Sequence, residues 1–350
     1  MANRIRKLLL ALPGFQALCR LLTRRHVRAL MYHRFRSGAN GNPRWPDAAC
    51  LRWQAALIAR HHAVWSPDDH LAALRGEPTP PGRCPVVITT DDGYLDFHEV
   101  ALPVFREHGL ASTLFVVTGF VDGDVWMWWD RLEHICRHAP AGRPTVDVAG
   151  KALALDLTTA AGRRAAWNDL ADRCRFLPNA VKLEVLGALE RALRVAVPAS
   201  PPPEYRAMSW EQLREAAGQG VSLGAHTVSH PILSRLDPAE ARAEIVGSRD
   251  RLAAAAGAAP AWFCYPQGGP ADFNAAVQGL VREAGFRGSY LAYQDLEREG
   301  DPFAMSRTCV SDDRTAFAWT LCGAEHLVLR LRQRLGRPER PGADYWAGAE

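Results

Sequence analysis

Short apolar runs alternate with helical segments along most of the chain, and this alternation restricts the fold more than any other feature. Strands that are apolar throughout and separated by helices indicate a parallel sheet covered by helices, because both faces of each strand are buried. The sequence therefore predicts an α/β protein, in which chemistry is expected at the carboxyl ends of the strands. The predicted strands lie near 28–32, 85–90, 112–118, 221–225, 261–265 and 305–310.

Helical segments with recognisable ends connect these runs. The segment after Leu236 offers Asp237 as an N-cap, Glu240 three residues later for a capping box, and Gly257 as a stop. Residues 98–110 carry apolar side chains at helical spacing. His108 and Gly109 near their end form a typical helix stop. These signals predict helices between the strands.

The alternation breaks between about 130 and 205. This stretch is rich in alanine, leucine and arginine, has helical spacing, and closes with the proline-rich PASPPPEY. We interpret it as a helical insertion that carries no catalytic constellation. The chain then divides into an N-terminal basic segment (1–27), a main domain (28–325) with the insertion, and a C-terminal basic helix and tail (326–350).

Composition narrows the function classes. The 350 residues are 48% hydrophobic and carry a net charge of +4, so a broad cationic face for nucleic acid is not expected. The eight cysteines form no CxxC pair and do not cluster with histidines. We expect buried thiols in a reducing compartment, and therefore a cytoplasmic protein.

The N-terminal segment is basic and then apolar, but Pro13, Gln16, Arg20 and the pair Arg24 and Arg25 interrupt the apolar run. A signal peptide or a membrane span needs a longer unbroken core. Two interpretations stay open: a helix packed on the domain, which we favour, or a basic amphipathic segment at the inner membrane surface.

Two adjacent acids, Asp91 and Asp92, follow the predicted strand 85–90 and precede Gly93. A single acid at a strand end is usually an Asx turn or a helix N-cap. Two in a row at the end of a buried strand, where a parallel α/β protein presents side chains to its ligand, favour a functional site.

A second cluster, His226 and His230, follows the predicted strand 221–225. Four-residue spacing allows both imidazoles to reach one ion, and Pro231 limits any helix through them, so we expect a loop or single turn. One aspartate and two histidines can together bind a metal ion as three ligands, which leaves coordination positions open for water and substrate. An adjacent second carboxylate is then free to take a proton from bound water.

These two clusters carry a family resemblance. TTDDGYLD resembles the first motif, T-F-D-D-G, of the polysaccharide deacetylases (the NodB-homology enzymes of carbohydrate esterase family 4), with Thr90 in place of phenylalanine. HTVSHP matches their second motif, H-[ST]-x-x-H-P. The similarity extends over roughly residues 28–310, and ALMYHRF resembles the M-Y-H start of one branch.

The resemblance implies a distorted (β/α) barrel and one divalent metal ion, usually zinc, held by Asp92, His226 and His230, with Asp91 as general base. It implies hydrolysis of an N-acetyl group on an amino sugar of a glycan or lipid-linked sugar, with the metal lowering the pKa of water from ~16 toward ~7. An O-deacetylase or another amidohydrolase on the same barrel is the alternative.

The third motif, commonly R-x-P-Y, departs from the pattern. Cys264 stands where the arginine that orients the base is expected, and Gln267 where the tyrosine is. The backbone N–H of Gln267 can still donate to an oxyanion. We assign the role of orienting the base to Arg307. The alternative is that Arg307 is an ordinary surface or salt-bridged arginine of a strand.

The general acid also departs from the usual late L-x-H motif. His326 lies on an arginine-rich helix that we interpret as a solvated face, whereas His33 ends the first predicted strand. Members with the M-Y-H start supply the acid histidine there, so we assign it to His33; the alternative is a packed core histidine. A leaving amine needs such a proton donor.

Three tryptophans, Trp126, Trp128 and Trp129, precede the insertion. We favour a core role for them over sugar binding. Two other function classes are less consistent with the sequence. A non-haem iron oxygenase also uses two histidines and a carboxylate, but on an antiparallel scaffold. A metal-free glycan-binding protein is favoured only by the departure at Cys264.

Overall fold

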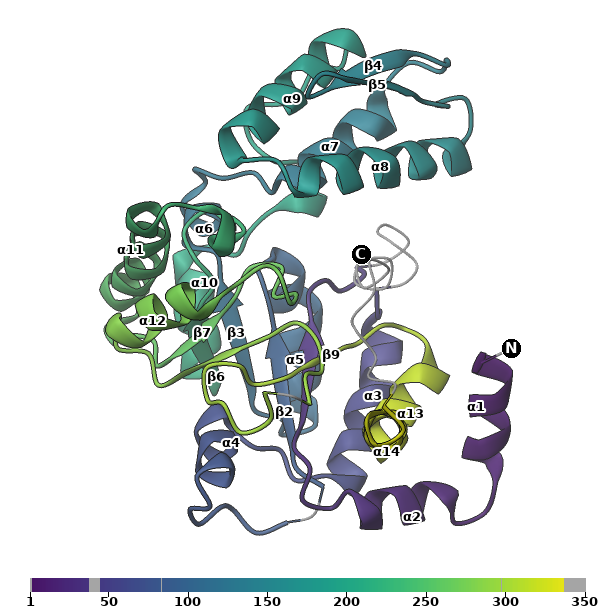
Figure 1. Cartoon of the computed structure of the whole chain (residues 1–350), viewed down its shortest axis with the longest axis vertical. Coiled ribbons are helices and arrows are strands. Elements are labelled where there is room, and N and C mark those ends of the chain that lie inside the picture. Colours follow the sequence, from purple (N-terminus) through teal and green to yellow (C-terminus); the bar gives the residue numbers. More distant parts are fainter. Residues whose placement is uncertain (1, 38–44, 83, 297, 337–350) are drawn as a thin grey trace.

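The computed structural model describes residues 2–37, 45–82, 84–296 and 298–336. A curled parallel sheet surrounded by helices forms the larger part of the molecule, and the insertion stands above one end of it (Figure 1). The predicted tail beyond residue 336 lies outside the described residues.

Seven parallel strands form the main sheet in the order β8-β7-β6-β3-β2-β1-β9. Five of the six predicted strands are confirmed within two residues at each end, whereas the run 305–310 pairs over only two residues. The strand β8 was not predicted, because it begins with a glycine and a serine, and Tyr290 is its only residue that favours a strand. The strands are β1 Arg28–Tyr32, β2 Val86–Thr90, β3 Ser112–Val116, β6 Val221–Ala225, β7 Trp262–Cys264, β8 Gly288–Tyr290 and β9 Thr308–Cys309.

The sheet curls so far that its two ends approach each other, which gives the distorted, partly open barrel expected from the motifs. A parallel bridge joins Tyr290 at the end of β8 to Met305, just before β9. Alternate residues such as Ala29 and Phe115 pack inside the curl, while their neighbours pack under the outer helices. Gly224 is required inside, since a Cβ there would lie 2.4 Å from the Phe115 ring.

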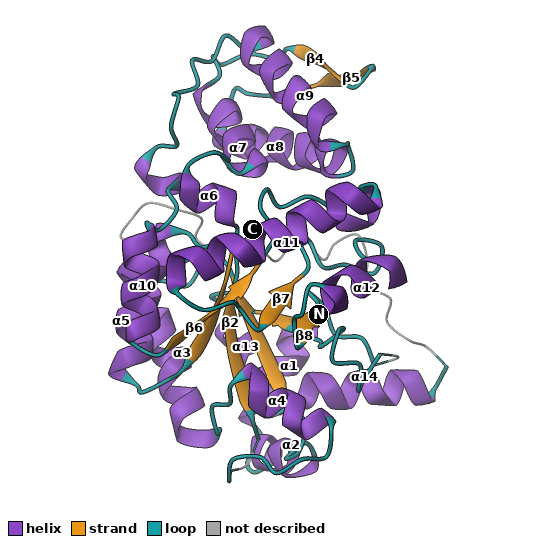
Figure 2. Cartoon of the chain, turned by 90° about the vertical axis from the view of Figure 1, so that its left-hand side faces the viewer, coloured by secondary structure: helices purple, strands orange, loops and turns teal. Residues whose placement is uncertain are grey.

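Helices cover the outer face of this sheet (Figure 2). The predicted capping box of α11 is present, with Asp237 and Glu240 bonding each other's backbone, and Gly257 ends the helix with φ 79°. The helices of the main domain are α3 Ala48–His61, α4 Pro67–Leu74, a π-helical turn Phe97–Ala101, α5 Leu102–Glu107, α6 Thr118–Asp122, α10 Trp210–Gly218, α11 Pro238–Ala256 and α12 Ala275–Glu283, with short 3-10 turns at Pro203–Tyr205 and Leu233–Arg235.

The insertion has a hydrophobic core of its own, which includes Trp128, Leu132 and Trp167. It consists of α7 Trp128–His138, α8 Ala160–Arg175 and α9 Asn179–Ala192, together with an antiparallel hairpin of β4 Thr145–Val148 and β5 Lys151–Ala154. The hairpin was not predicted, because the surrounding alanine- and leucine-rich segments dominate the pattern.

Both ends of the described chain pack together. The helices α1 Ala2–Ala11 and α2 Phe15–Leu22 lie against α13 Arg314–Cys322 and α14 Ala324–Arg334. The predicted solvated position of His326 on α14 is wrong: its side chain is buried, and its ring stacks on His26 with centroids 3.6 Å apart. Among the helices that the structure describes, none combines the length and apolarity needed to span a bilayer.

Candidate active site

The register of the parallel strands brings the predicted site residues to one edge of the sheet. Tyr32 pairs with Thr90, so His33 and Asp91 leave their strands side by side. On the other side of β3, Val116 pairs with Ala225, which places His226 at the same level. The two motifs are therefore adjacent at the carboxyl ends of the strands, as the sequence predicted.

Arg307 binds Asp91 at the base of the site. Two guanidinium nitrogens of Arg307 donate to the two carboxylate oxygens, at 2.7 and 2.6 Å, and both side chains are buried. The Arg307 Nη2 atom also lies 2.8 Å from the sulfur of Cys264. The small thiol thus leaves room for an arginine that arrives from the segment before β9.

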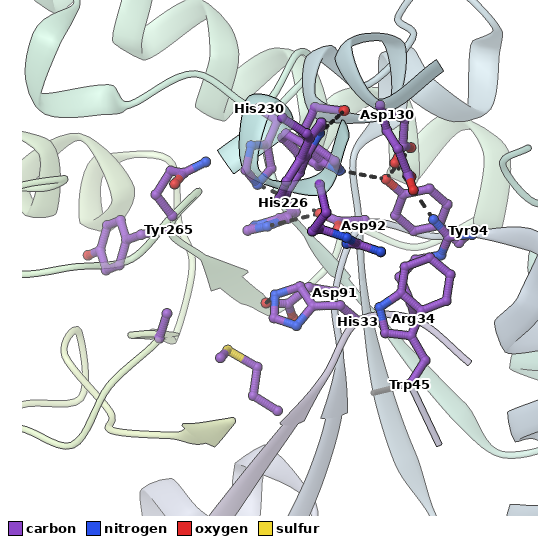
Figure 3. A pocket seen from close by; sticks show the side chains of 17 residues that line it. His33, Arg34, Trp45, Asp91, Asp92, Tyr94, Asp130, His226, His230 and Tyr265 are labelled. Atoms are coloured by element: carbon purple, nitrogen blue, oxygen red, sulfur yellow. Dashed lines mark hydrogen bonds and ion pairs between the residues drawn. The ribbon is translucent and has the colours of Figure 1, made fainter. Parts of the chain in front are cut away.

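Asp92, His226 and His230 form a second, separate group. The Nε2 atoms of His226 and His230 lie 3.6 and 3.7 Å from Oδ1 of Asp92. His226 Nδ1 is 2.8 Å from the carbonyl of Cys264, which orients the ring and leaves Nε2 facing Asp92 (Figure 3).

The histidine motif is a loop, as expected, and its shape is held from outside. Thr227 and His230 both have a left-handed backbone, with φ 69° and 59°. Glu244 of α11 accepts hydrogen bonds from the N–H groups of Val228 and Ser229, each at 2.8 Å. These bonds fix the turn that directs both imidazoles toward Asp92.

The two adjacent acids have opposite electrostatic surroundings. Burial alone raises the pKa of Asp91, but the Arg307 guanidinium outweighs this and holds that pKa below its usual range. Burial and the negative charges of Asp91 and Asp130 raise the pKa of Asp92 well above its usual range. Asp91 is therefore ionised by its protein partner, whereas Asp92 needs another cation nearby to be ionised.

The donor set of the second group fits a divalent metal ion. Ligand atoms around a tetrahedral ion at about 2.1 Å stand roughly 3.4 Å apart, close to the two separations from Asp92. Oδ1 of Asp92 is buried without a hydrogen-bond partner among the described residues. Burial lowers the pKa of both His226 and His230, so they present the neutral rings that a metal binds.

His33 and Gln267 line the same cavity. His33 Nε2 lies 3.8 Å from Oδ2 of Asp91, its side chain is 24% exposed, and burial lowers its pKa to about 4, an effect that Asp91 partly offsets. Gln267 has a left-handed backbone with φ 63°. Its N–H donates to no backbone carbonyl within the described part of the chain, so the geometry leaves it open as a donor.

The insertion contributes a wall of this cavity, which the sequence did not indicate. The cavity holds about 60 Å³. Trp128 lies in the core of the insertion, as predicted. Trp129 packs only partly against that core, and its ring also packs edge-to-face on His230 with ring centroids 4.9 Å apart. The insertion residues that line the cavity are Trp129, Asp130, Glu133, Arg164 and Trp167.

A buried polar network attaches this wall to the barrel. Tyr94 donates to Asp130 at 2.6 Å and accepts from the Trp129 indole at 3.0 Å. Arg34, next to His33, lies 3.7 Å from Asp130, bonds Asp96 at 2.6 Å, and stacks over the Tyr94 ring at 3.8 Å. The third acid after β2, Asp96, is therefore a structural partner of Arg34. Two features of the sequence could have indicated this network: Arg34 directly follows His33, and Asp130 directly follows Trp129.

Fold and site together define a class: a parallel α/β barrel with an aspartate and two histidines at its strand ends and a second, arginine-bound aspartate beside them. Residues 190–289 match the family model of polysaccharide deacetylases, a range that includes the histidine motif and lies after Asp91 and Asp92. This match agrees with the polysaccharide deacetylase family that the two motifs predicted.

Known relatives agree with this assignment. YxkH of Bacillus subtilis (strain 168), whose curated name assigns it provisionally to the polysaccharide deacetylases, is 26% identical over 110 residues. That alignment spans 31% of this chain and 38% of YxkH, so well under two thirds of the relative is covered.

Solved structures share the fold at low identity. The Streptococcus pyogenes deacetylase PplD, solved with acetate, matches with a TM-score of 0.53 and 16% identity over 82% of this chain and 93% of its own. IcaB from Ammonifex degensii matches with a TM-score of 0.55 and 17% identity over 85% of this chain and 97% of its own. The distorted (β/α) barrel is thereby confirmed; the M-Y-H branch and the individual residue roles stay predictions.

Proposed function

We propose that this chain is a metal-dependent hydrolase that removes N-acetyl groups from amino sugars of a glycan. The observation that carries the proposal is the separation of two buried aspartates into different environments. Asp91 is held by Arg307, while Asp92 faces two histidines across a gap of metal-ligand size. The family match supports an acetylated polysaccharide as the substrate class.

Asp92, His226 and His230 would hold one divalent ion, for which zinc suits the nitrogen and oxygen donors. When bound, the ion polarises the acetyl carbonyl and lowers the pKa of water. Asp91 accepts a proton from the attacking water, and Arg307 keeps its carboxylate fixed in position. The N–H of Gln267 is our proposed donor to the developing oxyanion.

His33 transfers the proton to the leaving nitrogen. Burial keeps its imidazole neutral at rest, so it must first gain a proton. Asp91, 3.8 Å away, is the source once it has taken a proton from water. Because the pKa of Asp91 lies below its usual range and that of His33 is about 4, transfer from Asp91 to His33 is favourable.

The insertion selects the sugar. Trp129 and Trp167 present aromatic surface to the cavity, and Arg164 stands exposed at its rim. Aromatic surfaces suit the apolar faces of sugar rings, and a few polar groups fix orientation. Arg164→Ala should raise KM several-fold and leave kcat nearly unchanged, whereas the control Arg173→Ala, exposed on the same helix, should alter neither.

Acetate release from a panel of acetylated glycans tests the reaction. Purified chain loaded with Zn²⁺ is incubated with N-acetylglucosamine oligomers and with an O-acetylated xylan. Release from the N-acetylated oligomers that is absent in Asp91→Asn supports the proposal. Release from the O-acetylated polymer alone would assign the chain as an esterase.

A further inference from the structure

Large apolar side chains are exposed mainly on the three helices at the ends of the described chain. Apart from these helices, the described residues expose only Phe176 and Leu183 in this way, both in the insertion. We call the exposed set the basic apolar face. Its apolar members are Ile5, Leu8 and Leu12 on or directly after α1, Leu18, Leu21 and Leu22 on α2, and Val328, Leu331 and Leu335 on or directly after α14.

The spacing shows that each helix is two-sided. On α14, Val328, Leu331 and Leu335 recur at three and four residues, so they form one outward ridge, and α1 repeats the same spacing. The opposite sides pack inward: Cys19 of α2 lies in a cluster with Trp319. The side chains of the outward ridges are therefore not needed for the packing of the domain.

Basic side chains surround these ridges. A groove of about 700 Å³ runs between α2 and α14, lined by Leu22 and Leu331 and by the guanidinium groups of Arg25, Arg330 and Arg334. Arg330 pairs with Glu299. The groove therefore joins apolar surface to cationic groups that bind phosphate oxygens well.

Charge is distributed unevenly along the chain. Residues 1–27 hold six lysines and arginines and no acid, and 324–335 hold three arginines and one glutamate, a net charge of +8. The whole chain carries only +4, so the remaining residues carry −4. The positive field is thus concentrated where the apolar ridges are exposed.

We propose that the basic apolar face docks on an anionic phospholipid bilayer. Leucine and isoleucine side chains would enter the boundary between headgroups and acyl chains, while the arginines and lysine meet lipid phosphates. A purely apolar partner would gain nothing from this concentration of positive charge, and a second copy of the chain would repel it, since both surfaces carry the same sign.

The placement leaves the active site accessible. Figure 1 shows α2 at the end of the molecule opposite the insertion, whereas the catalytic cavity lies between the barrel and the insertion. A bilayer at α2 would therefore not cover the cavity. The docking proposal is independent of the proposed reaction.

Co-sedimentation with vesicles tests the docking. The full chain is mixed with vesicles of phosphatidylcholine alone or of phosphatidylcholine with 30% phosphatidylglycerol, at low and at high salt. We expect binding to the anionic vesicles that is at least ~10-fold tighter than to the neutral ones and that weakens with salt. Equal binding to both vesicles, or none, overturns the proposal.

Matched variants locate the contact. Leu21→Ser with Leu331→Ser should reduce vesicle affinity by ~10-fold or more, and Arg24→Gln with Arg25→Gln should do so for anionic vesicles. The controls are Phe176→Ser with Leu183→Ser and Arg173→Gln with Arg191→Gln, all exposed in the insertion. Equal losses in the controls, or a lipid-free dimer that Leu21→Ser with Leu331→Ser converts to a monomer, would overturn the assignment.

Discussion

Arg307 and Asp91 form a buried bidentate ion pair although 216 residues separate them in the chain. Arg307 lies just before β9 and reaches across the barrel end to the residue that follows β2. Its remaining donors are bound as well: Nε donates to the carbonyl of Leu291 at 2.7 Å, and Nη1 to Thr89 at 3.0 Å. The base is therefore held in one orientation by a side chain that is itself fixed.

Removing this arginine should change the pH dependence of the reaction. The base must be ionised, and Arg307 holds its pKa low against the effect of burial. In Arg307→Ala that pKa rises, so the acidic limb of kcat/KM should move to higher pH, with lower turnover at its maximum. Loss of a buried partner should also cost ~3–5 kcal/mol of stability.

Arg307→Lys is the informative control for that shift. A lysine keeps the positive charge and loses the bidentate fork, so its acidic limb should lie between those of the wild type and Arg307→Ala. An unchanged acidic limb in both variants would show that Asp91 does not act as the base.

The neighbouring aspartates should separate metal binding from catalysis. Asp91→Asn removes the proton acceptor and should retain metal while losing activity; Asp92→Asn removes an anionic ligand and should lose both. Elemental analysis and acetate release on the same preparations measure the two effects. Metal loss in Asp91→Asn with retention in Asp92→Asn would reverse the assignment.

One divalent ion per chain is expected. Protein purified without chelator should contain near-stoichiometric metal. His226→Ala should reduce its occupancy sharply, because it removes one of the two imidazoles whose Nε2 atoms lie 3.6 and 3.7 Å from Oδ1 of Asp92. His108→Ala, on the end of α5, is the matched control. Occupancy that is the same in both variants would contradict the site.

His33→Ala should reduce N-deacetylation by roughly 10²–10⁴ with metal retained. Because the role of His33 is to protonate a poor leaving group, the same variant should keep hydrolysis of an aryl acetate within ~10-fold of the wild type. Equal loss on both substrates would indicate a positioning role instead of proton transfer.

Buried His70 should make stability depend on pH. Burial lowers its pKa to about 4, and its ring bonds Tyr290 inside the barrel at 3.2 Å. Its ordinary pKa is 6.5, so the unfolded chain binds the proton first as pH falls. The contribution of His70 is present above pH 6.5 and is lost between 6.5 and about 4, up to ~3 kcal/mol.

Chemical unfolding of His70→Gln and of the wild type across this range measures the effect. The variant should lose less stability between pH 6.5 and 4 than the wild type. His108→Gln, whose imidazole remains partly exposed, should keep the wild-type slope. An unchanged slope in His70→Gln would contradict the assignment.

The sequence by itself determined the scaffold and the contents of its motifs. Apolar runs and capping signals are local, so the strands β1, β2, β3 and β6 and the ends of α11 could be predicted from neighbouring residues alone. Asp91, Asp92, His226 and His230 could be selected because each group directly follows a strand, and parallel strands end at one edge.

Only the tertiary structure decided which distant side chains complete the site. For Arg307 the sequence left two alternatives, and the contact with Asp91 decides between them. That contact forms because the sheet curls until β9 lies next to β1, and no local pattern encodes that curvature. Trp129 and Asp130 reach the cavity because the insertion folds on its own core and then packs over the strand ends. Contacts of this kind depend on how whole units pack, whereas a sequence pattern reports only on one segment at a time.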